Sequence, residues 1–211
     1  MIKKQQEIKA IIFDVGGVIL DLNKKKTLRI PESISTIYGI SIEEARKIWV
    51  TYDRRSLLTG AETPKTFLRN ISRAIDTSKT PETLYEEWTK LSLKEENCID
   101  WKLLDFIKNL REKYKIYVMS NAVNIAQEDK LTRTIKSMFD KYFVSYEEGF
   151  RKPEKEAFLN VLKKIDCNPE NCIFVDDTLI NINTAKEMKI NSIIYKSLEQ
   201  LKKDIKEIVD K

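Results

Sequence analysis

Four polar clusters carry the residue types that could perform chemistry in this chain, and each follows a short apolar run. Asp14 ends the apolar run 10–13, and the consecutive glycines Gly16 and Gly17 come after Val15. The later clusters are Ser120-Asn121, Arg151-Lys152-Pro153 and Asp176-Asp177. Ligands of open α/β sheets bind beyond the carboxyl ends of the strands, so we expect the clusters to meet in one site.

Phosphoryl transfer is a reaction that these residue types allow. The Asp14 carboxylate can attack phosphorus to form an aspartyl-phosphate, which divides one difficult hydrolysis into two easier steps. Asp14 and the phosphoryl group are both anionic, so a cation such as Mg²⁺ must lie between them. The Ser120 hydroxyl and the Asn121 backbone N–H can donate hydrogen bonds to phosphate oxygens, and Lys152 supplies positive charge.

Each cluster also has a purely structural interpretation. An aspartate at a strand end, such as Asp14, is often a turn residue. Asp176 and Asp177 could cap a helix together with Asn181, although two adjacent carboxylates repel each other unless a cation joins them. Ser120 could be the N-cap of the helix that follows it. The glycines after Asp14 and the paired carboxylates favour the chemical interpretation.

Periodicity predicts the elements that position these clusters. Short apolar runs predict strands at 9–14, 115–119, 142–144, 172–175 and 192–195. Helical spacing predicts helices at 100–112, up to about 138, from Pro153 to about 165, at 180–188 and at the C-terminus. Alternation of strands and helices is typical of an α/β fold with a parallel sheet and crossover helices.

The segment 21–97 has a different character, because helical spacing dominates it and no convincing strand is predicted. We expect Ser41 to be an N-cap with Glu44 at the third helical position, and we expect Pro64 and Pro81 to begin two further helices. The predicted domains are therefore a core formed by 1–20 and 98–211, and a helical insertion, 21–97, after the first strand.

Composition limits the classes of function. The 211 residues, 42% hydrophobic and 34% charged, suit a globular protein with one large or two small domains. The net charge of +5 comes from interleaved signs, with Lys24–Lys26 as the longest basic run, so we expect no nucleic-acid partner. The absence of histidine excludes histidine bases, histidine-dependent triads and histidine metal ligands.

Three further features predict a cytoplasmic protein. The cysteines, Cys98, Cys167 and Cys172, have no metal-binding spacing and are expected to be reduced thiols. The first seven residues lack the hydrophobic core of a signal peptide. No apolar run approaches the ~18–20 residues that a membrane helix needs, so no membrane partner is expected.

Taken in order, the four clusters resemble the four motifs of the haloacid dehalogenase superfamily. The matching segments are Phe13–Val18, Val118–Asn121, Glu148–Pro153 and Phe174–Thr178 with Asn181. The resemblance implies a Rossmann-like parallel-sheet core in three α/β/α layers, with an inserted α-helical cap domain. It further implies a Mg²⁺-dependent phosphatase, monomeric or homodimeric, for a small phosphorylated metabolite such as a sugar phosphate.

The same resemblance implies a role for each cluster. Asp14 would be the nucleophile, with Ser120 and Lys152 as further catalytic residues. The implied metal ligands are Asp14, Asp177 and the Gly16 carbonyl, with Asp176 acting through a water or as an orienting group. The implied phosphate-binding residues are Ser120, Asn121, Lys152 and Gly17.

One position departs from the family pattern. Most phosphatases of the superfamily carry a second aspartate two residues after the nucleophile, and here that position is Gly16. The Asp-x-Gly-Gly form is similar to a subgroup of glucose-1-phosphate phosphatase-like members. Sugar 1-phosphates and acyl phosphates have good leaving groups and need less help from an acid. Asp21 is a substitute acid or a hydroxyl acceptor, or else a turn residue.

The sequence is also compatible with two other functions. A 2-haloacid dehalogenase uses the same nucleophile without the second aspartate, although the acidic pair Asp176-Asp177 would repel a carboxylate substrate. A weakly active or inactive phosphate-binding protein is the other alternative, because Gly16 cannot transfer a proton. In the implied cap, Arg54 and Arg55 precede Gly60 in a predicted loop, where one of them could reach a second anionic group of the substrate, or both could be solvated.

Overall fold

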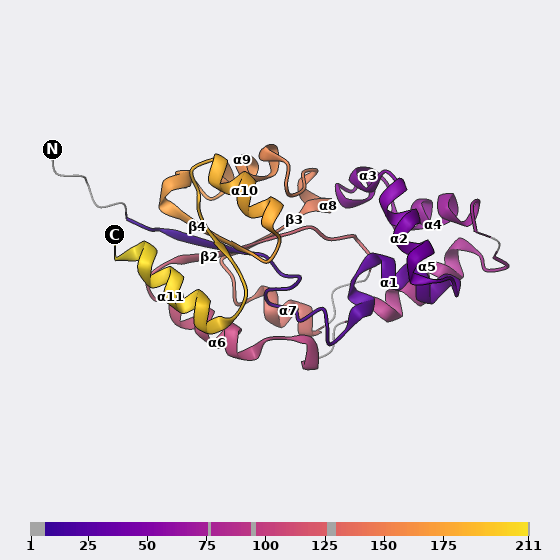
Figure 1. Ribbon diagram of the computed structural model, residues 1–211, viewed down its shortest axis with the longest axis horizontal. Coiled ribbons are helices and arrows are strands. Elements are labelled where there is room, and N and C mark those ends of the chain that lie inside the picture. The colour runs from indigo at the N-terminus through magenta and orange to yellow at the C-terminus, as the bar shows by residue number, and fades with distance from the viewer. Residues whose placement is uncertain (1–6, 76, 94–95, 126–129, 211) are drawn as a thin grey trace.

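A five-stranded parallel sheet forms the centre of the molecule (Figure 1). The computed structural model describes residues 7–75, 77–93, 96–125 and 130–210. The strand order is β3-β2-β1-β4-β5. The strands are β1 Ala10–Phe13, β2 Lys115–Ser120, β3 Lys141–Val144, β4 Cys172–Asp176 and β5 Asn191–Ile194. The predicted strands and their parallel arrangement are confirmed.

The strand order reverses at β1, and this places the first, second and fourth polar clusters beside one another. Phe13 pairs with Val118 of β2 on one side and with Val175 of β4 on the other. Each of these three strands therefore runs into its cluster at the same edge of the sheet. Crevices at such switch points are where open α/β sheets bind ligands.

Helices cover both faces of the sheet and complete the predicted three layers. The covering helices are α6 Trp101–Leu110, α7 Lys130–Lys136, α9 Lys155–Lys164, α10 Leu179–Glu187 and α11 Leu198–Val209. Ile11 and Phe13 pack in one apolar cluster with residues of α6 and α11, whereas Ile12 packs in another with residues of α9 and α10. Both faces of β1 are thus buried, as expected for a parallel sheet.

The chain between β1 and α6 forms a separate group of helices beyond one edge of the sheet (Figure 1). These helices are α1 Ile30–Tyr38, α2 Ile42–Thr51, α3 Arg54–Leu58, α4 Pro64–Ser72 and α5 Pro81–Ser92. Phe67 and Trp88 are buried in an apolar cluster of this group. The Ser41 hydroxyl accepts from the Glu44 N–H, so the predicted N-cap is confirmed, as are the helix starts at Pro64 and Pro81.

The chain leaves the sheet and returns to it through two paired segments. The Asp21 N–H donates to the Cys98 carbonyl at 2.7 Å, and the Asp100 N–H donates to the Ile19 carbonyl at 2.9 Å. The predicted domain boundaries lie in these segments. That 21–97 acts as a domain of its own stays a prediction.

Three local predictions are wrong. Pro153 does not begin a helix, because 151–154 form a turn in which the Glu154 N–H donates to the Arg151 carbonyl, and α9 starts at Lys155. Ser120 is not an N-cap, because 121–125 are not helical. Arg54 lies in α3 rather than in a loop, since the Asp53 carboxylate accepts from the Arg55 N–H and starts a short helix.

The remaining short helices are α8 Ser145–Glu148 and the 3₁₀ turns Lys26–Leu28, Glu96–Cys98 and Pro169–Asn171. Cys98, Cys167 and Cys172 form no disulfide bond. Within the described ranges, no helix has the length and apolarity needed to cross a membrane.

Candidate active site

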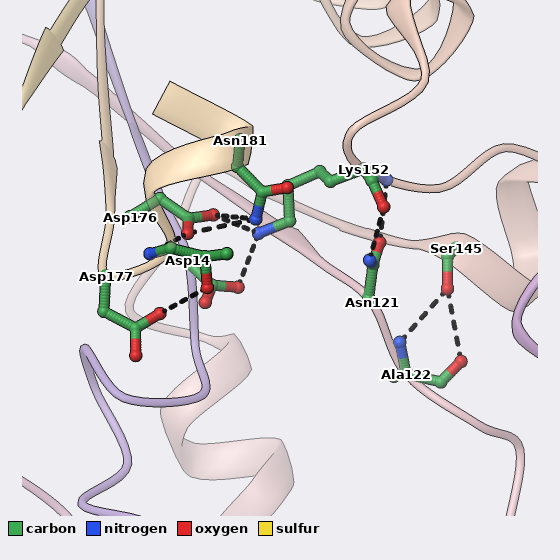
Figure 2. A network of polar contacts seen from close by, with 9 residues as sticks. Asp14, Asn121, Ala122, Ser145, Lys152, Asp176, Asp177 and Asn181 are labelled. Atoms are coloured by element: carbon green, nitrogen blue, oxygen red, sulfur yellow. Dashed lines mark hydrogen bonds and ion pairs between the residues drawn. The ribbon is translucent and has the colours of Figure 1, made fainter. Parts of the chain in front are cut away.

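The candidate site lies at the carboxyl ends of β1 and β4, where two buried aspartates meet (Figure 2). The Asp14 N–H donates to the Val175 carbonyl at 2.8 Å, which continues the β1–β4 ladder and fixes the backbone of Asp14. Asp176 is the last residue of β4 and has no exposed surface. Two carboxylates are thus held close together in a part of the protein where unpaired charge is costly.

Lys152 joins the two carboxylates. Its ammonium lies 2.6 Å from Asp14 Oδ1 and 2.7 Å from Asp176 Oδ2, and the residue is 2% exposed. Burial alone would lower the pKa of Lys152, but the charges of Asp14 and Asp176 outweigh burial and raise it above the ordinary value. The lysine therefore stays charged and supplies a fixed cation beside Asp14.

Asn121 holds the backbone of Lys152 in place. The Asn121 side chain accepts from the Lys152 N–H at 2.9 Å and donates to the Lys152 carbonyl at 2.8 Å. Ser145 makes a similar pair of bonds to the backbone of Ala122 (Figure 2). Neither role was predicted from the sequence. A pattern that could have indicated both is a short side chain with donor and acceptor atoms directly after an apolar strand.

Asp176 is oriented inward by several donors. Besides Lys152, the Asn181 amide donates to both of its oxygens at 3.1 and 3.0 Å, and the Thr178 N–H donates at 2.8 Å. Its lone pairs are thus largely directed at protein donors. This arrangement supports the orienting role among the two roles that the resemblance implies for Asp176.

Asp14, Asp176 and Asp177 together could hold a metal ion. Each offers a carboxylate oxygen, and the three oxygens lie within 4.8 Å of one another. Oxygen ligands of this kind suit Mg²⁺. Asp177 is the most exposed of the three residues, but partial burial of its carboxyl still raises the pKa of that group above the ordinary value. A cation at this position would favour the charged form of all three carboxylates.

Gly16 and Gly17 differ in whether their surroundings leave space for a side chain. A Cβ at Gly17, whose φ is +82°, would lie 2.0 Å from Asp177 Oδ2, whereas a Cβ at Gly16 would lie 3.5 Å from Leu22 Cδ1. Gly17 therefore leaves room for the Asp177 carboxylate. Its N–H donates to the Leu20 carbonyl at 2.8 Å in this conformation. The phosphate-binding role of Gly17 stays a prediction.

Gly17→Ala is expected to weaken Mg²⁺ binding about 10- to 100-fold, the usual effect of disturbing the support of a metal ligand. The added methyl group must displace Asp177 and also meets an unfavourable positive φ. Titration calorimetry with Mg²⁺ measures the loss. Gly16→Ala is the matched control, because its methyl group meets only ordinary van der Waals contact. Equal losses in the two variants would contradict the steric explanation.

The metal-free protein is expected to lose stability as the pH rises from about 4 to about 6. Burial raises the pKa of Asp14 from 3.8 to about 6, and Lys152 only partly opposes this. The folded protein then binds more protons than the unfolded chain in this range, so stability falls with pH. This difference in pKa between the folded and unfolded states corresponds to roughly 3 kcal/mol in the free energy of unfolding.

Urea denaturation in EDTA at several pH values tests this expectation. The stabilising contribution is present below pH 4 and lost above pH 6, and Asp14→Asn removes it. The stability difference between wild type and the variant must therefore change across this range. A constant difference would show that Asp14 does not titrate as stated.

Ser120 and Asn121 border a cavity of about 300 Å³ together with Val15 and Gly16, the two residues that follow Asp14 in the chain. The sheet register places Ser120 opposite Val144, at the end of β2. Ser120 therefore lies at the same end of the sheet as Asp14 and Asp176, where the carboxyl ends of the strands meet. Its bond to a phosphate oxygen stays a prediction.

The arginines and Asp21 have partners within the protein. Asp21 Oδ1 accepts from the Asn23 N–H at 2.9 Å, which supports its interpretation as a turn residue. Arg55 reaches Glu154 at 3.0 Å and so links α3 to the turn that carries Lys152. Arg54 lies over the Trp49 ring at 5.8 Å. Each arginine thus has a partner within the protein, and the contact of one of them with a second anionic group of the substrate stays a prediction.

Comparison with known proteins gives a family and a set of similar folds. The model of the haloacid dehalogenase-like hydrolase family matches residues 8–189. D-ribitol-5-phosphate phosphatase of Bacteroides thetaiotaomicron is 27% identical over 191 residues, which span 86% of this chain and 88% of that protein.

Two solved structures resemble this one over most of their length. A HAD-like family hydrolase from Porphyromonas gingivalis has a TM-score of 0.76 and 26% identity, covering 97% of this chain and 98% of its own. A HAD family enzyme from B. thetaiotaomicron, solved with magnesium and inorganic phosphate, has a TM-score of 0.70 and 25% identity, covering 90% and 96%.

Proposed function

Because the chain belongs to the haloacid dehalogenase-like hydrolase family, and is thus a hydrolase of phosphate esters, we propose that it is a Mg²⁺-dependent phosphatase acting through an aspartyl-phosphate on Asp14. The observation that carries the proposal is that carboxylate oxygens of Asp14, Asp176 and Asp177 lie within 4.8 Å of one another, while the buried Lys152 pairs with Asp14 and Asp176. The substrate is a small phosphorylated molecule, which the helical segment 21–97 covers as a cap.

The residues divide into a nucleophile, a metal site and a phosphate site. Asp14 attacks phosphorus and the bond to the leaving oxygen breaks. Asp14, Asp177 and the Gly16 carbonyl, with Asp176 behind them, would hold Mg²⁺, which would supply positive charge to neutralise the phosphoryl group. The remaining donors to the phosphoryl oxygens are Ser120, the backbone N–H of Asn121 and Lys152. The Gly17 N–H donates to the Leu20 carbonyl, so it would have to give up that bond to take the phosphate-binding role that the resemblance implies.

Lys152 has two functions in this proposal. As a fixed cation, it keeps Asp14 ionised, although burial raises the pKa of that carboxyl. It also presents positive charge where negative charge develops on the transferring group. Because Asn121 and Asp176 hold it before substrate binds, little reorganisation is needed during the reaction.

The dehalogenase alternative fits the site less well. A 2-haloacid substrate brings its own carboxylate, which Asp177 would repel. A phosphate ester, by contrast, binds to carboxylates through a metal ion. The similarity to a protein named as a phosphatase supports the same choice.

Gly16→Asp is expected to raise kcat for alkyl monophosphates about 10²-fold, the lower range of general acid catalysis. The new carboxyl would protonate an alkoxide leaving group, and its Cβ has room beside Leu22. Gly16→Asn is the matched control, since it adds similar bulk without a titratable proton. Rates for acetyl phosphate, whose leaving group needs no acid, should change little. Equal kcat values for alkyl monophosphates in the two variants would contradict the expected role.

Phosphate release from a panel of esters, with Mg²⁺ and with EDTA, tests the proposed function. The panel includes acetyl phosphate, a sugar 1-phosphate and alkyl and aryl monophosphates. We expect release that requires Mg²⁺ and is fastest for good leaving groups. Halide release from 2-haloacids without phosphate release would favour the dehalogenase, and absence of both activities in the folded protein would favour a phosphate-binding protein.

A further inference from the structure

The cavity beside the phosphate site indicates the chemical class of the leaving group. It has a volume of about 300 Å³ and lies where residues after β1 and β2 meet helices α5 and α7. Its wall includes Gly16, two residues after Asp14 in the chain, and Ser120 and Asn121 at the end of β2. A substrate with its phosphoryl group at Asp14 could therefore place its leaving group in this cavity.

Apolar side chains dominate the cavity wall. They include Leu20, Leu22, Leu28, Trp88, Leu93 and Val123. Among the described residues of the wall, Lys136 alone is charged, and none is a carboxylate. The wall also carries polar side chains, which are Ser92, Ser120, Asn121, Thr132, Tyr142 and Tyr146. A polyol would pair some of its hydroxyl groups with them, but the hydroxyl groups that face the apolar majority of the wall would lose their hydrogen bonds to water, which costs free energy for each one.

We propose that the substrate is a phosphate monoester of an apolar, hydroxyl-poor alcohol or phenol rather than a phosphorylated polyol. This inference rests on the proposed phosphatase function and specifies its substrate class. The bond between phosphorus and the leaving oxygen breaks, the oxygen takes a proton from water, and the products are the alcohol or phenol and inorganic phosphate.

The volume indicates the size of a leaving group that the cavity could accommodate. A water molecule occupies about 30 Å³ of the liquid, so the cavity holds on the order of ten non-hydrogen atoms. The position that would carry the acid also faces an apolar neighbour, because a Cβ at Gly16 would lie 3.5 Å from Leu22 Cδ1. An apolar leaving group of six to ten carbon atoms fits both observations.

A series of para-substituted phenyl phosphates tests the inference. Phenyl, 4-ethylphenyl and 4-butylphenyl phosphate differ in apolar area, while their leaving groups have nearly the same acidity. We expect kcat/KM to rise about threefold to fourfold per added methylene, the effect of burying one such group. It should exceed kcat/KM for D-ribitol 5-phosphate and for a sugar 1-phosphate.

Two exposed apolar residues provide a variant and its matched control. Leu93 follows α5 and lines the cavity, whereas Val50 on α2 is exposed and does not line it. Leu93→Gln is expected to reduce the ratio of kcat/KM between 4-butylphenyl and phenyl phosphate about threefold or more. Val50→Gln should leave that ratio unchanged.

Binding of phosphonates separates this inference from the proposed function. Phenylphosphonate and 4-butylphenylphosphonate are not hydrolysed, and calorimetry in Mg²⁺ measures their affinities. Tighter binding of the butyl compound, with a more negative heat-capacity change, supports the apolar cavity even if no phosphate is ever released. If the phenyl phosphates are hydrolysed with equal kcat/KM, or the polyol phosphate is hydrolysed faster than they are, the inference is overturned and the phosphatase function remains supported. Equal affinities together with no turnover overturn both.

Discussion

Asp14→Asn is expected to reduce Mg²⁺-dependent phosphate release by at least about 10⁴-fold, since loss of a nucleophile removes the covalent route altogether. The amide has nearly the shape of the carboxyl but cannot attack phosphorus. The Asp14 backbone bond to Val175 does not involve the side chain and should persist. Phosphate release and circular dichroism measure activity and fold in the same samples.

The fold of this variant should be retained or stabilised. The wild-type cluster places two carboxylates around one ammonium, and the substitution leaves the single ion pair between Lys152 and Asp176. Asp105→Asn, at an exposed position on α6, is the matched control and should keep full activity. Wild-type turnover in Asp14→Asn would eliminate the aspartyl-phosphate mechanism.

Lys152→Met is expected to destabilise the metal-free protein by about 3–5 kcal/mol, the usual cost of removing one partner from a buried ion pair. Methionine fills a similar volume but leaves Asp14 and Asp176 buried without a cation. Phosphate release should also fall steeply, because the fixed charge beside the nucleophile is lost. Chemical denaturation in EDTA at pH 7 measures the stability.

A second substitution distinguishes charge from packing. Asp176→Asn on top of Lys152→Met removes one of the unpaired carboxylates, so it should restore part of the stability without restoring activity. Lys155→Met, at an exposed ion pair with Glu187, is the control and should have little effect. The loss of stability in Lys152→Met should also be smaller at low pH, where Asp14 is protonated. A pH-independent loss would point to packing instead.

The residues that end strands were predictable from the sequence, because buried parallel strands have a strong local signal. Apolar runs predicted β1, β2 and β4. Because open α/β sheets bind ligands beyond the carboxyl ends of their strands, Asp14, Ser120 and Asp176 were then expected to lie close together. The position of Lys152 beside Asp14 was expected only from the motif resemblance. Its second contact, with Asp176, depends on side-chain packing that no local pattern encodes.

Contacts between distant segments account for what the sequence analysis missed. The Asn121 side chain binds the backbone of Lys152, 31 residues away, so its role could not be predicted from strand periodicity. Likewise, Arg55 pairs with Glu154 across 99 residues. The apolar wall of the cavity combines residues from the core and from the helical segment, and only the folded chain brings them together.

The phosphoenzyme should accumulate during turnover, because position 16 offers no base to activate the water that would hydrolyse it. The most direct test of the proposed function is to mix the protein with Mg²⁺ and acetyl phosphate, quench in acid within milliseconds to seconds, and digest for mass spectrometry. We expect the mass of the peptide that contains Asp14 to increase by one phosphoryl group. This increase should be absent in Asp14→Asn and absent in EDTA. Steady phosphate release with Asp14 unmodified at every time point would contradict it.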